Sequence, residues 1–267
     1  MSDAETREAM LAALAWQVEL GADEPVGDAP VNRYAAPAEA SSPAQARAPG
    51  PATAAAAPGP APVDGSAADP VAEAEALAAA AATLEALAAA QAAYDRCELK
   101  RGARSFVFAD GNPGARVMIV GEAPGREEDI EGRPFVGRAG QLLDRMFAAI
   151  GLSRSAPDPE AAIYITNVMP WRPPGNREPE PAEMAMMQPF LRRHVELAGP
   201  DILVLMGNTP CAALLGRRGI TRLRGTWTEA LGRPALPMTH PAYLLRNPEA
   251  KREAWADLLE IRARLDG

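Results

Sequence analysis

From about residue 115 to the C-terminus, short runs of apolar residues alternate with longer amphipathic stretches. Short apolar runs between turn residues are typical of strands that are buried on both faces of a sheet. Four runs predict strands, at residues 117–120, 164–167, 202–206 and 235–238. The stretches around them predict helices, at residues 138–150, 180–198, 209–215 and 248–265. Because strands that alternate with helices favour parallel pairing, we expect an α/β fold with three α/β/α layers and a central, mostly parallel four-stranded sheet.

The first 68 residues have a different texture. Ser2 and Glu5 match a capping box, and apolar residues recur at helical spacing as far as Val18, so residues 1–21 are predicted to form a short amphipathic helix. This helix either docks on the main domain or binds a partner protein, and the sequence favours neither alternative. Residues 22–68 are rich in Pro, Ala and Gly. Such a segment cannot bury enough apolar surface to offset the entropy of ordering it, so we expect a disordered linker.

The main domain is predicted at residues 69–267, with its core at 94–265. Asp69 followed by Pro70 is a helix-start signal, because Asp caps a helix N-terminus and Pro suits the first helical position. We expect one helix to continue from there through the alanine-rich stretch, with Leu77, Leu84 and Leu87 on one side.

The acidic overall charge comes from the N-terminal third of the chain. Residues 1–89 carry a net charge of −10 and residues 90–267 a net charge of +2, which together give −8. The acidic balance therefore does not exclude nucleic-acid binding by the main domain. There is no apolar run of membrane-spanning length, no signal-peptide pattern, and only two isolated cysteines. We therefore expect a soluble, cytoplasmic protein without a membrane segment or a disulfide framework.

Segments rich in glycine, proline and polar residues follow the predicted strands. In parallel α/β folds, ligands bind at the carboxyl ends of the strands, so these segments form the candidate site. They are Gly121-Glu122-Ala123-Pro124-Gly125 with the loop 132–140 that follows it, Thr166-Asn167-Val168, Trp171-Arg172-Pro173-Pro174-Gly175-Asn176-Arg177, and His240-Pro241-Ala242-Tyr243-Leu244-Leu245-Arg246. The first segment is neither a GxGxxG loop nor a Walker loop, and taken alone it is equally consistent with ordinary turn chemistry.

Together, these segments resemble those of the family 4 uracil-DNA glycosylases, within the wider uracil-DNA glycosylase superfamily. The likeness extends from about Tyr94 to about Leu259. It implies a monofunctional enzyme that hydrolyses the N-glycosidic bond of a deoxyuridine flipped out of DNA and leaves an abasic site, the first step of base excision repair. No lysine lies in these segments, which argues against a Schiff-base lyase step.

The resemblance also assigns a uracil pocket. Phe135 matches the family's stacking residue, and Asn167 occupies the position of the amide that pairs with uracil O4 and N3–H. Glu128 is the best match to the barrier beside uracil C5 that excludes thymine, in the same loop as Ala123 and Gly125.

The catalytic groups follow from the same likeness. His240 matches the donor that stabilises negative charge on uracil O2. Glu122 is the leading candidate for stabilising positive charge on the sugar and orienting the attacking water. Ala123 replaces the Asp that does this in the commonest uracil-DNA glycosylases, so the water-activating residue is left open, with Asn176 as a second candidate. The other histidine, His194, lies in a predicted helix and is expected on the surface.

DNA contacts are expected from arginines, which bind phosphate and so position the protein, and from an apolar wedge after His240. The candidates are Arg138, Arg177, Arg222, Arg224, Leu244, Leu245 and Arg246. Each arginine taken singly is also consistent with a solvated surface.

One departure from the family concerns its four-iron cluster, which four cysteines hold. The matching positions here are Tyr94, Cys97, Trp171 and Met187. One thiolate cannot hold a cluster that needs four ligands, so we expect no iron–sulfur cofactor and no other metal. Large apolar side chains at these positions are expected to fill the space by packing.

Two alternatives to the glycosylase remain open: a non-catalytic DNA-binding or polymerase-associated module, and a glycosylase for another deaminated base such as hypoxanthine or xanthine. The partners expected are uracil-containing DNA and, through residues 2–20, a repair or replication protein. A monomer is expected, since one flipped base needs one pocket.

Overall fold

The structure of the chain is a computed structural model that describes residues 69–267. The helix expected at residues 1–21 and the linker expected at 22–68 lie outside the described residues. Among residues 69–267, no helix combines the length and the apolar character that crossing a membrane requires.

A six-stranded sheet runs through the described part, in the order β1-β3-β2-β4-β6-β5. Its four inner strands are parallel and correspond to the four predicted strands: β2 (Val117–Gly121), β3 (Ile163–Asn167), β4 (Ile202–Met206) and β6 (Arg233–Met238). The predicted α/β class with a mostly parallel sheet is therefore confirmed.

Two further strands enlarge the four-stranded sheet that the sequence predicts. The short strands β1 (Ala109–Gly111) and β5 (Thr228–Ala230) pair antiparallel with β3 and β6 at the two edges. Both are only three residues long and mostly half-buried or exposed. They therefore lack the apolar runs that mark the inner strands.

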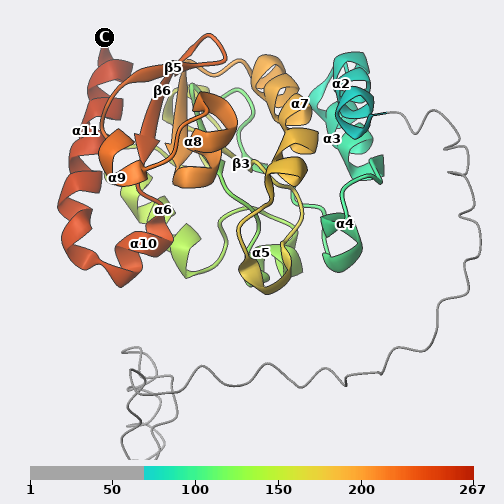
Figure 1. Cartoon of the computed structure of the whole chain (residues 1–267). Coiled ribbons are helices and arrows are strands. Elements are labelled where there is room, and N and C mark those ends of the chain that lie inside the picture. Colours follow the sequence, from blue (N-terminus) through green and yellow to red (C-terminus); the bar gives the residue numbers. More distant parts are fainter. Residues whose placement is uncertain (1–68) are drawn as a thin grey trace, which may run out of the picture. The chain divides into compact units, whose positions relative to one another are not determined.

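Helices cover both faces of the sheet (Figure 1). One face carries α2 (Pro70–Ala80), α3 (Leu84–Ala93), α7 (Pro181–Ala198) and α8 (Asn208–Leu215). The other carries α6 (Arg138–Ala148), α10 (Pro241–Arg246) and α11 (Lys251–Asp266). Within residues 69–267, the connections contain the short α-helices α4 (Leu99–Gly102), α5 (Arg126–Glu131) and α9 (Ile220–Leu223). They also contain the 3₁₀ turns η1 (Pro159–Ala161), η2 (Pro174–Asn176) and η3 (Pro248–Ala250).

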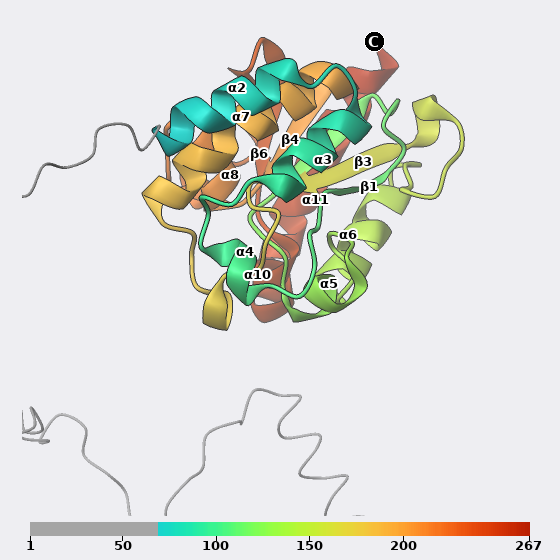
Figure 2. The same cartoon turned by 90° about the vertical axis from the view of Figure 1, so that its right-hand side faces the viewer.

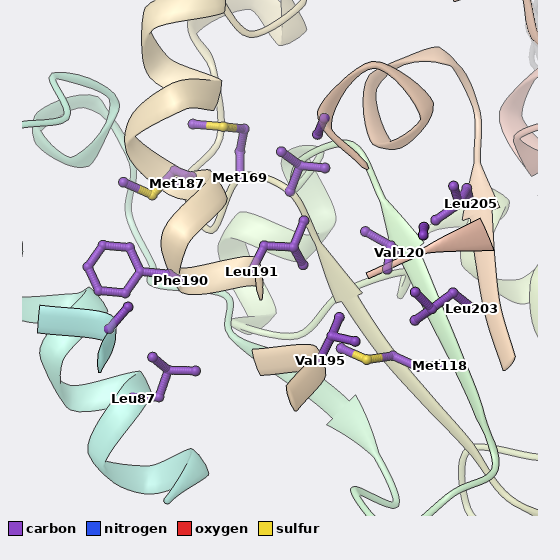
Figure 3. Packing of buried hydrophobic residues seen from close by; sticks show 14 of the residues in the cluster. Leu87, Met118, Val120, Met169, Met187, Phe190, Leu191, Val195, Leu203 and Leu205 are labelled. Carbon is purple, nitrogen blue, oxygen red and sulfur yellow. The ribbon is translucent and has the colours of Figure 1, made fainter. Parts of the chain in front are cut away.

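The sheet separates two hydrophobic cores, because successive side chains of a strand point to opposite faces. In β2, Met118 and Val120 belong to the core beneath α7, and Val117 and Ile119 to the core beneath α11. We call these the α7-side core and the α11-side core. In the α7-side core, Met187 and Phe190 of α7 lie among side chains from α3 and the sheet (Figure 3).

The alanine-rich stretch forms two helices rather than the one expected. Asp69 caps α2 as predicted, since its side chain accepts a hydrogen bond from the Val71 amide at 3.0 Å. The break follows Ala80, where the Ala81 carbonyl accepts hydrogen bonds from Arg193 of α7 at 2.9 and 3.0 Å. Thr83 then caps α3 through the Ala86 amide. A tertiary contact and a second cap thus overcome the helical preference of the alanines.

His194 is also not where the sequence analysis places it. Its side chain is buried in the α7-side face, stacked on Phe108 with ring centroids 4.3 Å apart, and its Nε2 shares a hydrogen bond with the Tyr164 hydroxyl at 2.9 Å. Burial lowers the pKa of His194 to about 3. The sequence around a histidine in a helix does not show whether its side chain is buried and hydrogen-bonded or exposed.

Candidate active site

The segments singled out in the sequence converge at one edge of the sheet. Gly121 and Asn167 end the paired strands β2 and β3 in register, and His240 follows β6 after a single residue. The helices that begin there, α5 after β2 and α10 after β6, lie at the same end of the molecule in both views (Figures 1 and 2). The parallel arrangement alone brings these segments together, as the strand order requires.

Gly121 is the point on which two candidate side chains converge. A Cβ atom at this position would lie 2.3 Å from Asn167 Oδ1 and 2.5 Å from Phe135 Cε2. The amide and the aromatic ring therefore both approach the Gly121 backbone more closely than any larger residue would allow. In the sequence, Gly121 is one residue of a Gly/Pro-rich loop, and its packing role is visible only in the structure.

Phe135 has an uncommon backbone conformation for a residue with a side chain, with φ at +54°. Its side chain is 6% exposed, and its ring lies over the His240 ring with centroids 5.3 Å apart and planes 27° apart. Such left-handed conformations cost roughly 1–3 kcal/mol and persist where the surroundings restrain them.

Three neighbours provide that restraint. Glu128 Oε1 accepts hydrogen bonds from the Val136 and Gly137 amides, each at 3.0 Å. Arg154 donates to the carbonyl oxygens of Pro134 at 2.9 Å and Phe135 at 2.8 Å.

The third restraint is steric. A Cβ at Gly140 would stand 1.8 Å from the Phe135 carbonyl oxygen, so only glycine fits there. Arg154 is 13% exposed at its side chain and also pairs with Asp110 and Asp144. Sequence reasoning missed Arg154, because an arginine in a connecting loop carries no sign of its partners.

His240 is the N-cap of α10, and its Nδ1 accepts a hydrogen bond from the Ala242 amide at 3.1 Å. An imidazole that accepts at Nδ1 carries its proton on Nε2. Burial, and secondarily the positive charge of Arg246, lower the pKa of His240 to about 4. At neutral pH, His240 is thus an uncharged imidazole with one N–H donor, at Nε2.

Glu122 lies directly after β2, and its side chain is half-buried. The buried Thr209 hydroxyl donates a hydrogen bond to Glu122 Oε2. The Glu122 carbonyl oxygen accepts a hydrogen bond from the Met169 amide at 3.0 Å. Thr209, at the start of α8, is a second residue that sequence reasoning missed, because nothing in the pattern Gly207-Asn208-Thr209 marks its partner.

Glu128 holds two loops of the site together through hydrogen bonds to their backbone amides. Its side chain is 9% exposed, and its Oε2 accepts the Gly125 amide at 3.0 Å while Oε1 accepts the two amides after Phe135. Both carboxylate oxygens are thus bound by backbone donors. Ala123, in the same loop, is partly buried against the α7-side core.

Asn176 is exposed, at φ +54°, and its Oδ1 accepts a hydrogen bond from Arg172 at 2.8 Å. Within the part of the chain that the structure describes, Asn176 forms no hydrogen bond with Glu122 or His240.

The predicted DNA-contacting residues divide into two groups. Arg138, Arg222 and Arg246 are exposed, and Leu245 is half-buried. The other three have structural contacts: Arg177 pairs with Glu183 through both guanidinium ends, Arg224 pairs with the buried Asp257, and Leu244 is 1% exposed in the α11-side core. Leu244 therefore packs inside the protein, which contradicts its expected role as a wedge. The sequence Leu244-Leu245 does not indicate which of the two leucines is buried.

The four positions that the resemblance assigns to the family's cysteines all belong to the α7-side core. All four side chains are at most 2% exposed. The Tyr94 hydroxyl donates to the Pro70 carbonyl at 2.7 Å and its ring meets Phe190 edge-on, while Met187 Sδ accepts from Gln91 at 3.7 Å. Burial raises the pKa of the Cys97 thiol. One buried thiol among a phenol, an indole and a thioether is not a ligand set for a four-iron cluster, so these residues do not fit that group.

A buried aromatic ring, a side-chain amide and an uncharged imidazole at the carboxyl edge of a parallel sheet define an α/β protein whose site suits a planar, hydrogen-bonding ring. A family model described as the uracil DNA glycosylase superfamily matches residues 108–259, which include all three groups. The chain belongs to this superfamily.

Several relatives are similar over most of their own length. The type-4 uracil-DNA glycosylase of Thermotoga maritima is 41% identical over 154 residues, 57% of this chain and 77% of that protein. The type-4 enzymes of Sulfurisphaera tokodaii and Archaeoglobus fulgidus are 37% and 36% identical over 180 and 175 residues, in each case 62% of this chain, and 78% and 85% of those proteins.

Proposed function

We propose that the protein is a monofunctional uracil-DNA glycosylase. It hydrolyses the bond between uracil and C1′ of deoxyribose in DNA and leaves an abasic site. The observation that carries this proposal is that Asn167 and Phe135 converge on Gly121 and that the Phe135 ring lies over the His240 ring. The names and similarity of the relatives support it.

The amide of Asn167 supplies selectivity. One donor and one acceptor on the same planar group match the O4 acceptor and the N3–H donor of uracil, whereas cytosine presents the opposite pattern. A base in a duplex reaches such a group only after it flips out, which costs a few kcal/mol. Stacking on the Phe135 ring returns about 1–3 kcal/mol of that cost. In this proposal Glu128, with Ala123 and Gly125, shapes the space beside uracil C5.

His240 acts on the leaving group. When the N1–C1′ bond breaks, both electrons stay with uracil, and negative charge gathers at O2. A neutral imidazole donating from Nε2 stabilises that charge without transferring its proton. Glu122 stabilises the positive charge on the sugar, and water adds at C1′ while its proton passes to a carboxylate or to solvent. Asn176 is kept as a second candidate for orienting this water.

DNA is bound through phosphate contacts, which we assign to the exposed Arg138, Arg222 and Arg246, with Leu245 as the apolar wedge. Abasic sites are intermediates of base excision repair, and we propose that the enzyme acts in this pathway, on DNA in the cytoplasm. We further propose that it acts as a monomer, and that residues 2–20 recruit a repair or replication partner. A chain lacking residues 1–68 that repairs uracil in cells as well as the full chain would refute that recruitment.

The proposal is tested by single-turnover assays with the full chain on labelled oligonucleotides that carry one uracil, followed by alkali to break abasic sites. Matched oligonucleotides carry thymine or hypoxanthine, and Asn167→Ala is compared with the parent. We expect cleavage at uracil only, with strong loss in the variant. Cleavage at hypoxanthine but not uracil would establish the alternative glycosylase, and DNA binding without any cleavage would establish the non-catalytic module.

A further inference from the structure

Within residues 69–267, the side chain of Glu122 accepts a single hydrogen bond, from the Thr209 hydroxyl to Oε2. Thr209 is 1% exposed and is the second residue of α8, which begins two residues after β4 ends. Since β2 and β4 are neighbours in the sheet, the start of α8 lies beside the loop that carries Glu122.

The backbone of Glu122 is fixed independently of Thr209. The Glu122 carbonyl oxygen accepts from the Met169 amide at 3.0 Å, and the Gly121 carbonyl oxygen accepts from the Val168 amide at 2.9 Å. These two bonds extend the pairing of β2 with β3 past the end of the strands. The remaining freedom of Glu122 is rotation about its side-chain bonds, and the hydroxyl of Thr209 opposes that rotation.

We propose that Thr209 is a positioning residue for the reaction: its hydroxyl holds one oxygen of the Glu122 carboxylate, so that the other oxygen, Oε1, faces the sugar and the attacking water. This inference rests on the proposed glycosylase function. It matters because displacement of a reacting group by about 1 Å costs up to roughly 100-fold in rate.

A purely structural explanation competes with this one. The same hydrogen bond joins α8 to the end of β2, and removing a buried partner destabilises a protein whatever its function. The two explanations differ in what Thr209 changes: a structural link lowers the unfolding temperature alone, whereas a positioning residue slows the chemical step in protein that is fully folded.

The experiment compares Thr209→Val, which keeps the shape and removes the hydroxyl, with Thr209→Ser, which keeps the hydroxyl. Single-turnover excision from a uracil oligonucleotide is measured below the unfolding temperature of each full-length variant. We expect excision to be about 10- to 100-fold slower in Thr209→Val and close to the parental rate in Thr209→Ser. The dissociation constant for an oligonucleotide with a non-cleavable 2′-fluorinated deoxyuridine is expected to stay unchanged in both.

A double-mutant cycle then tests whether Thr209 acts through Glu122. In a Glu122→Gln background, with enzyme in large excess so that slow rates are measurable, adding Thr209→Val is expected to change little. A Thr209→Val enzyme as fast as the parent, or an equal loss in the Glu122→Gln background, would overturn the inference while leaving the glycosylase intact. Absence of uracil excision by the parent would overturn both.

Discussion

The α7-side core and the carboxyl edge of the sheet show two different relations between sequence and structure. In the core, the positions of Tyr94, Cys97, Trp171 and Met187 require only that space be filled, and ordinary packing fills it. At the edge, Phe135 has a left-handed backbone, and Gly121 and Gly140 leave no room for a Cβ. The comparison teaches that positions defined only by volume accept many kinds of side chain, whereas a site defined by backbone positions tolerates few replacements.

The largest effect expected is on stability, in the core. Met187→Ala removes a fully buried side chain, which should lower the free energy of unfolding by about 2–5 kcal/mol. Denaturant unfolding measures this loss. Uracil excision by the folded fraction should remain at the parental rate, and a reduced rate in folded Met187→Ala would show that the two regions are coupled.

At the carboxyl edge, His240→Ala should have the opposite signature. Loss of the single N–H donor should slow excision by about 100- to 1,000-fold, or roughly 2.7–4 kcal/mol, as removal of one such donor does elsewhere. Single-turnover rates measure this effect. His194→Gln is the matched control, since it alters the other histidine, which lies in α7 and packs in the α7-side face. Equal losses in both variants would refute the role of His240.

A smaller loss is expected from Gly121→Ala. The added methyl group overlaps Asn167 Oδ1 and the Phe135 ring, so both must shift, and excision should slow by about 10- to 100-fold. Gly102→Ala is the control, because nothing lies within 4 Å of a Cβ there. Both variants are compared with the parent by kcat/KM on uracil oligonucleotides. A Gly121→Ala enzyme with the parental kcat/KM would contradict the close packing of Asn167 and Phe135 against Gly121.

Acid should lower the free energy of unfolding through a histidine in each of the two regions. The pKa is about 4 for His240 and about 3 for His194 in the folded protein, against an ordinary value of 6.5. Above pH 6.5 both rings are neutral in both states and contribute nothing. As the pH falls below 6.5, the unfolded chain binds protons that the folded protein does not, so the free energy of unfolding drops by about 1.4 kcal/mol per pH unit for each ring.

Unfolding in denaturant at pH 7, 6 and 5 measures this slope. The slope in His194→Gln should be about half as steep, and an unchanged slope would show that His194 titrates normally. The same pKa predicts that excision does not fall as the pH crosses 6.5, since His240 stays neutral there.

The smallest effect concerns Cys97. If the α7-side core is held by packing alone, the purified protein should contain no iron in proportion to the chain, as measured by iron and sulfide analysis. Cys97→Ala should then cost only about 1 kcal/mol of stability, because it removes one small buried group. Stoichiometric iron in the parent that is lost in Cys97→Ala would break the comparison.

The inner strands and the main helices were predictable from sequence because each has its own local pattern, an apolar run for a strand and an amphipathic stretch for a helix. The edge strands β1 and β5 were not predictable, because three residues are too few to show a periodicity. The break between α2 and α3 was not predictable either, because Arg193, which donates to the Ala81 carbonyl there, lies 112 residues away in the chain. In the site, Asn167 ends β3, His240 lies two residues after β6 and Phe135 follows α5, and all three were singled out through the resemblance to the family 4 enzymes. Arg154 and Thr209 act through partners distant in sequence, and the pairing of Arg224 with Asp257 is equally invisible to a local reading.

The left-handed backbone at Phe135 has a consequence for how the protein meets its ligand. Because Glu128, Arg154 and Gly140 hold that conformation within the folded chain, its energetic cost is met when the protein folds and not when a base arrives. Under the proposed function, an entering base would therefore meet a stacking surface that is already formed, and the loop would not have to close around the base.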